Sequence, residues 1–104
     1  MKKANKLIRD KIPGIMDKKK KQYKTKTVTD KQVIPFLCKK VTEELKEFKD
    51  SKYSKAELVD LMDVVITLSD KLGYDLEELE TMSEKKAKAR GLFEENIILL
   101  EYEE

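Results

Sequence analysis

The sequence has no histidine, no tryptophan and a single cysteine among its 104 residues. Without histidine it can form neither a Ser-His nor a Cys-His catalytic triad, and it also lacks the commonest zinc ligand. The lone Cys38 cannot form an intramolecular disulfide, so nothing indicates an oxidising compartment. Any acid-base or metal chemistry must therefore use carboxylates, lysines and tyrosines.

Long apolar runs and a marked excess of one charge are missing as well. No segment approaches the ~20 apolar residues that cross a bilayer, and the basic N-terminus is not followed by the apolar stretch of a signal peptide. Lys and Arg number 23 against 21 Asp and Glu, which leaves a formal net charge of +2. This balance disfavours nucleic-acid binding. We expect a soluble, cytoplasmic protein with no membrane partner.

Few residues in the chain interrupt regular structure. There are three glycines and two prolines, and 104 residues is a common length for one domain. Pro13 suits the first turn of a short helix, which we expect to begin there. We therefore expect an all-α chain that forms a single domain over residues 1–104.

Helical periodicity predicts two long helices in the middle of the chain. The first has Asp30 as its expected N-cap and runs to about Lys49. Its predicted buried stripe consists of Ile34, Leu37, Val41, Leu45 and Phe48. The second begins with the Ser54 and Glu57 spacing of a capping box and runs to about Leu72. Apolar residues surround this second helix, which predicts burial on most sides.

The remaining pattern is less regular. A further helix is expected over residues 75–90, with Asp75 and Glu78 as a capping box. Residues 24–29 alternate Lys and Thr, and residues 93–102 include an Ile-Ile-Leu-Leu run. Both patterns favour strands, so we expect these segments to pair as a small terminal β-ribbon.

Carboxylates lie on one strip of the helix that begins near Ser54. At 100° per residue, Glu57, Asp60 and Asp63 fall on the same side, enclosed by apolar positions. A carboxylate that is removed from water without a partner costs several kcal/mol. The strip therefore needs cations, hydrogen-bond donors or a metal ion.

A tight turn centred near Lys52 would make the two long helices an antiparallel hairpin. Glu47 and Glu57 are equally far from that turn, and Glu44 and Asp60 match one helical turn further away. The four carboxylates then converge from facing helices. Such a set of hard oxygen ligands suits Mg²⁺ or Mn²⁺.

Ordinary helix chemistry offers other interpretations of the same residues. Lys40 and Glu44 have the i,i+4 spacing of an ion pair, and Glu57 could serve only as a helix cap. The acidic strip would then bind cationic groups of a partner, which makes a non-catalytic helical oligomerisation or interaction module the alternative function. Nucleic-acid binding through residues 18–26 is a third hypothesis, with Tyr23 as its only interleaved aromatic.

Three segments together resemble a known family. Glu43-Glu44-x-x-Glu47 followed by Glu57-x-x-Asp60 resembles the signature of the all-α nucleoside triphosphate pyrophosphohydrolase superfamily, which includes MazG-like proteins, dimeric dUTPases and phosphoribosyl-ATP pyrophosphohydrolase. The sequences NKLIRDKIP at 5–13 and KKAKARGLF at 85–93 are similar to its phosphoribosyl-ATP pyrophosphohydrolase-like branch. The resemblance covers most of the chain.

The resemblance implies a MazG-like fold in which helical hairpins assemble into a bundle as a homo-oligomer, a dimer or a tetramer. It implies hydrolysis of the α-β phosphate linkage of a nucleotide to give a monophosphate and pyrophosphate. The implied Mg²⁺ ligands are Glu44, Glu47, Glu57 and Asp60, with Mn²⁺ as a substitute ion. Glu43 is implied to act on the outer coordination shell or to orient the water.

Four basic residues are the candidate phosphate contacts, because guanidinium and ammonium groups complement phosphate oxygens. They are Arg9, Lys11, Lys86 and Arg90. The interval between the two acidic motifs is shorter here than is usual in the family, which leaves less loop to cover a nucleotide base.

Overall fold

The computed structural model describes residues 1–104 and contains four helices and no strand. The helices are α1 (Ile12–Lys18), α2 (Asp30–Asp50), α3 (Lys55–Lys71) and α4 (Leu76–Arg90). The all-α prediction is confirmed. None of the four helices has the length and apolar character needed to cross a bilayer.

The chain divides into two compact units. The first, Met1–Tyr74, contains α1, α2 and α3, and the second, Asp75–Glu104, contains α4. The single domain expected over residues 1–104 stays a prediction. The fold of the first unit is the one that positions the acidic residues.

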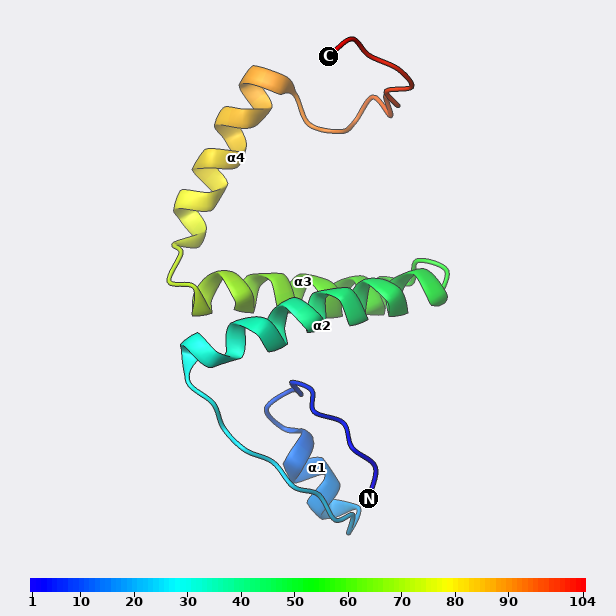
Figure 1. The fold of residues 1–104 in the computed structure, drawn as a ribbon, viewed down its shortest axis with the longest axis vertical. Helices are drawn as coiled ribbons and strands as arrows, with labels where there is room; N and C mark the ends of the chain where they lie inside the picture. Colours follow the sequence, from blue (N-terminus) through cyan, green and yellow to red (C-terminus); the bar gives the residue numbers. More distant parts are fainter. The chain divides into compact units, whose positions relative to one another are not determined.

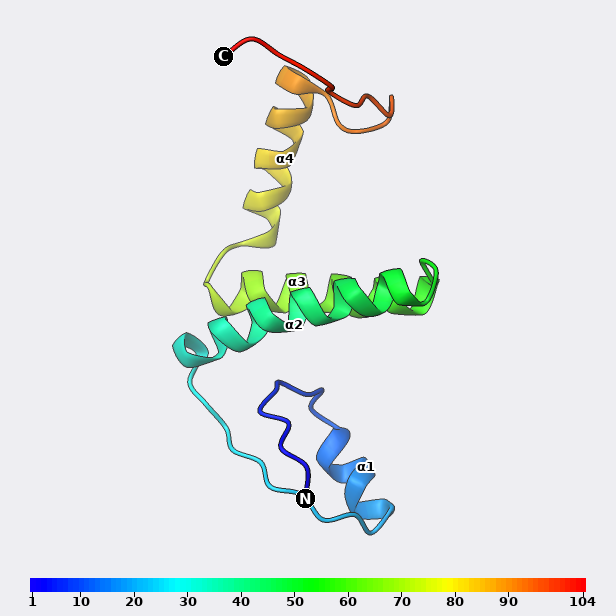
Figure 2. The same cartoon turned by 45° about the vertical axis from the view of Figure 1, so that its right-hand side comes forward.

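Helices α2 and α3 form the predicted antiparallel hairpin and lie side by side in both views (Figures 1 and 2). At the end of α2, Lys52 takes a left-handed conformation with a φ of 59°. The amide of Tyr53 donates to the carbonyl of Phe48 at 2.9 Å, and the two rings meet edge to face with centroids 5.5 Å apart. This hydrogen bond and this apolar contact are those of a Schellman C-cap, which closes the hairpin within four residues.

The N-caps differ in part from the predicted ones. Thr29, not Asp30, caps α2: its hydroxyl accepts from the amide of Gln32 at 3.1 Å, and the Gln32 side chain accepts from the amide of Thr29 at 3.1 Å. Asp30 lies in the first turn instead, where its charge complements the helix dipole. Asp75 caps α4 as expected, but through the amide of Glu77.

The hairpin buries less apolar surface than the sequence predicts. Leu37 is 1% exposed and Val33 is 8% exposed, and they are the buried apolar residues of the chain. No residue of α3 is buried, so the prediction of burial on most sides is wrong for the single chain. The physical reason is that α3 packs against one helix only, and one neighbour covers one side. The exposed face consists of Leu58, Val59, Met62, Val65, Ile66 and Leu72.

The predicted β-ribbon is also wrong. Residues 24–29 lead into α2 without regular structure, and residues 96–104 are likewise irregular. An isolated two-stranded ribbon is marginal in water unless it packs on an apolar surface, so alternation over about six residues does not stabilise strands. The two segments moreover belong to different compact units.

Replacing Leu37 by Ala is expected to lower the free energy of unfolding by about 2–5 kcal/mol, because it removes the one fully buried side chain of the hairpin. The matched variant is Leu45→Ala on the same helix, where the side chain is 45% exposed and a smaller loss is expected. Urea denaturation followed by far-UV circular dichroism measures both. Equal losses in the two variants would contradict this packing.

Candidate metal centre

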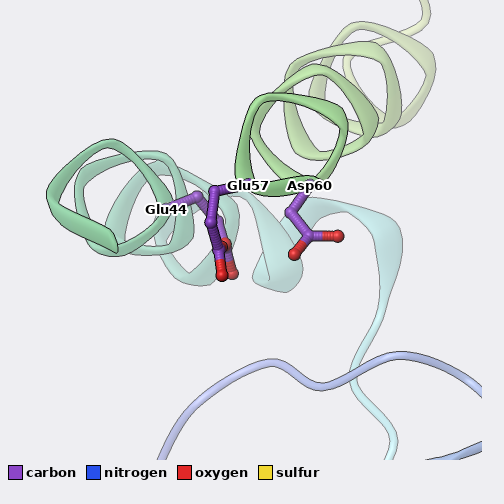
Figure 3. A group of neighbouring side chains, drawn as sticks. All are labelled: Glu44, Glu57 and Asp60. Carbon is purple, nitrogen blue, oxygen red and sulfur yellow. The ribbon is translucent and has the colours of Figure 1, made fainter. Parts of the chain in front are cut away.

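Three carboxylates meet on one side of the hairpin. Glu44 projects from α2, and Glu57 and Asp60 project from the first two turns of α3. One carboxylate oxygen from each lies within 4.8 Å of the others. Figure 3 shows the three side chains pointing to the same side of the two helices. We call this group the acidic cluster.

Burial makes the acidic cluster electrostatically costly. Glu44 is only 6% exposed, and Glu57 is half-buried. One oxygen of each, Oε2 of Glu44 and Oε2 of Glu57, is buried without a hydrogen-bond partner. Buried carboxylate oxygens normally have donors, because leaving one unsatisfied costs about 1–3 kcal/mol or more. A cation bound between these oxygens would remove that cost.

The pKa of Glu44 reflects this environment. Burial raises the pKa of the Glu44 carboxyl, and the neighbouring Glu47 carboxyl raises it further. Lys40, whose Nζ lies 3.4 Å from Glu44 Oε1, acts in the opposite direction but does not cancel the rise. The Lys40–Glu44 ion pair is the one that the i,i+4 spacing predicts, and it satisfies one oxygen only.

Glu43 contacts the N-terminal segment. Its Oε1 accepts from Lys6 at 3.1 Å and lies 3.6 Å from the Nζ of Lys40. Burial alone would raise the pKa of Glu43, but the two lysines outweigh burial and lower the pKa. Glu43 is therefore held as a charged group beside the acidic cluster.

Arg9 contacts the acidic cluster at Asp60. Its Nη2 donates to Asp60 at 2.6 Å and to Asp63 at 3.0 Å. These hydrogen bonds, to Asp63 first and then to Asp60, raise the pKa of Arg9. The guanidinium is about half exposed, so other N–H groups remain available to a ligand.

The other predicted site residues lie further away. Glu47 is exposed and adjoins Glu44, outside the group of three that converges within 4.8 Å. Lys11 is exposed at the start of α1 and forms none of the ion pairs. Lys86 and Arg90 are exposed on α4, in the second compact unit.

Two residues of this region were not among the predicted site residues. Lys6 reaches Glu43 across 37 positions of sequence, and no local pattern signals such a contact. Asp63 does carry a signal, since it lies on the same helical strip as Asp60 among apolar positions. No sequence pattern signals its contact with Arg9, which lies 54 positions away.

Comparison of the chain with protein-family models, with curated proteins and with solved structures found no match.

Replacing Glu44 by Gln is expected to stabilise the protein in EDTA at neutral pH by about 1 kcal/mol, roughly 4–8 °C in Tm for a domain of this size. A carboxyl whose folded pKa is raised contributes stability below its ordinary value of 4.5, and this contribution is lost as the pH rises through the folded pKa. The stability difference between Glu44→Gln and the natural chain should therefore grow as the pH increases above 4.5.

Thermal unfolding at a series of pH values measures this difference. The matched control is Asp70→Asn, at an exposed position of α3, which should not alter the pH profile. A Glu44→Gln protein that is no more stable than the natural chain at any pH would contradict the assigned burial.

Proposed function

We propose that the protein is a Mg²⁺-dependent nucleotide pyrophosphohydrolase that cleaves an α-β phosphate linkage and releases a monophosphate and pyrophosphate. The supporting observation is the convergence of Glu44, Glu57 and Asp60 within 4.8 Å, with two buried carboxylate oxygens that lack partners. The reaction class comes from the sequence, because these residues belong to two motifs that resemble the signature of the all-α pyrophosphohydrolase superfamily. We also propose membership of the all-α pyrophosphohydrolase superfamily on the same residues.

The donor set fits a hard divalent cation. All three converging groups are carboxylates, and the chain has no histidine that would favour zinc. Mg²⁺ commonly binds through a few carboxylates and keeps other positions for water and phosphate oxygens. Asp60 is partly exposed, so the acidic cluster is open to solvent on its side. Glu47 adjoins Glu44 and completes the proposed ligand set.

The remaining residues have roles that follow from their contacts. A bound ion neutralises charge on phosphoryl oxygens and lowers the pKa of a bound water. In this proposal Glu43, kept charged by Lys6 and Lys40, orients a water beside the acidic cluster. Arg9 contacts Asp60 and presents further guanidinium N–H groups, which suit bidentate contact with phosphate.

A helical interaction module is the second candidate, and the exposed face of α3 favours it. Leu58, Val59 and Met62 begin a row of apolar side chains that are 41–53% exposed in the single chain. Contiguous apolar surface of this kind marks contact sites, and a self-complementary face gives a symmetric dimer. We propose that a second copy covers the face, in a homo-oligomer that is compatible with catalysis or with a purely structural role.

Metal-dependent turnover tests the proposed reaction. Canonical and modified nucleoside triphosphates and phosphoribosyl-ATP are incubated with Mg²⁺, Mn²⁺ or EDTA, and pyrophosphate release is measured. We expect release with at least one nucleotide and none in EDTA. Glu57→Gln, Asp60→Asn and Glu47→Gln should each lower kcat on the order of 100-fold or more, because each removes a charge from the metal site.

Asp70→Asn on α3 is the matched control and should retain full activity. Circular dichroism of every variant confirms that the helices persist. Pyrophosphate release that is insensitive to EDTA, or that survives in both Glu57→Gln and Asp60→Asn, would sink the proposal. If no nucleotide of the panel releases pyrophosphate, the helical interaction module becomes the better explanation.

The oligomer is tested by sedimentation velocity. The natural chain is expected to sediment as a dimer or tetramer, and Met62→Lys should shift it toward the monomer, because a charge would be buried in the contact. Ile15→Lys makes the same kind of change at an exposed position of α1 and should leave the oligomer intact. A natural chain that sediments as a monomer would rule out the homo-oligomer.

A further inference from the structure

A cavity of about 500 Å³ lies between the N-terminal segment and α2. Ala4, Asn5 and Leu7 line it from the N-terminal side, and Phe36 and Lys39 are among the residues that line it from α2. Ligand pockets usually have volumes of about 300–1,000 Å³, so the size suits a small organic molecule. A second cavity is lined by consecutive residues 90–98, from the end of α4 onward, and brings together no comparable set of side chains.

The N-terminal segment is fixed over the cavity by specific contacts. Lys6 donates to Glu43 on α2, and Arg9 binds Asp60 and Asp63 on α3, so the segment is tied to both helices. Asn5 takes a left-handed conformation with a φ of 49°, which asparagine tolerates better than most residues. The backbone therefore turns at Asn5, where the wall of the cavity is formed.

The cavity has the chemistry that recognises a nucleobase. The half-buried ring of Phe36 offers an aromatic face, and Leu7 and the lysine stems extend the apolar wall. Asn5 carries an amide that can both donate and accept, as base edges require. Lys39 forms no ion pair with any carboxylate of the chain, so its charge is free to attract an anionic ligand.

Lys40 connects the lining of the cavity with the acidic cluster. Lys40 lines the cavity, and its Nζ lies 3.4 Å from Glu44 Oε1 in the acidic cluster. Glu43 likewise lines the cavity and is the immediate chain neighbour of Glu44. Lys40 and Glu43 therefore adjoin both the cavity and the carboxylates of the proposed metal centre.

We propose that this cavity is a nucleobase subsite, in which the base stacks on Phe36 while the phosphates extend past Lys40 toward the acidic cluster. The position of the phosphates rests on the proposed function, but the base subsite itself needs no metal ion. Residues 4–7 line the cavity from the N-terminal side and would cover the base there. Asn5, Leu7 and Phe36 then determine which base is accepted.

Binding in EDTA separates this proposal from catalysis. The full-length ¹⁵N-labelled chain is titrated with the 5′-monophosphates of adenosine, guanosine, uridine and cytidine, and with ribose 5-phosphate, which has no base. At least one monophosphate should bind about tenfold more tightly than ribose 5-phosphate, the order expected for one base-aromatic stack. The largest amide shifts should fall on residues 4–7 and around Phe36.

Phe36→Leu keeps an apolar side chain but removes the ring, and should weaken monophosphate binding about tenfold while ribose 5-phosphate binding stays unchanged. Phe48→Leu is the matched control, because Phe48 is also half-buried on α2 but packs on Tyr53 outside the cavity. Circular dichroism checks that both variants retain their helices. An equal loss in both variants would show that the ring acts through stability, and would overturn the proposal.

The outcomes distinguish the two proposals. Base-dependent binding at residues 4–7 without metal-dependent turnover would support the subsite and sink the hydrolase. Metal-dependent turnover would still support the hydrolase if the amide shifts fell on other residues, or if the monophosphates bound no more tightly than ribose 5-phosphate. Either result would overturn the base subsite. Absence of binding by every monophosphate would also overturn it.

Discussion

The structure depends on how the α2–α3 hairpin accommodates a buried carboxylate. Glu44 is the one buried charged residue of the chain, and its Oε2 has no donor while the adjacent Glu57 Oε2 has none either. A fold with so small an apolar core has little stability with which to offset that cost. The arrangement is therefore better explained by binding than by stability, because a cation between the helices would turn a destabilising pair into a link between them.

The N-terminal segment is organised by the same charges. Lys6 binds Glu43, the chain neighbour of Glu44, and Arg9 binds Asp60, the partly exposed member of the acidic cluster. These partly exposed ion pairs add little stability on their own. Their effect is geometric: they hold residues 4–9 along the hairpin, beside the carboxylates and over the cavity at Phe36. The proposed metal centre and the proposed base subsite thus share one segment of chain.

The sequence predicts the hairpin well because its signals are local. Helical periodicity, the Ser54 cap and the equal distances of Glu44 and Asp60 from the turn all act within about ten residues, and all three appear in the structure. The contacts of Lys6 and Arg9 span 37 to 54 residues and leave no periodic trace. The prediction that α3 is buried on most sides was wrong for the single chain. An apolar helix face indicates a contact surface, but it does not show whether the same chain or another copy covers that surface.

Binding of Mn²⁺ to the full chain tests the central claim most directly, because it needs neither the substrate nor the reaction. Free Mn²⁺ is followed by electron paramagnetic resonance as the protein is titrated, with Mg²⁺ added afterwards as a competitor. Convergence of Glu44, Glu57 and Asp60 on one ion predicts saturable binding that Mg²⁺ reverses and that Glu57→Gln abolishes. Weak, unsaturable binding that Glu57→Gln leaves unchanged would contradict it.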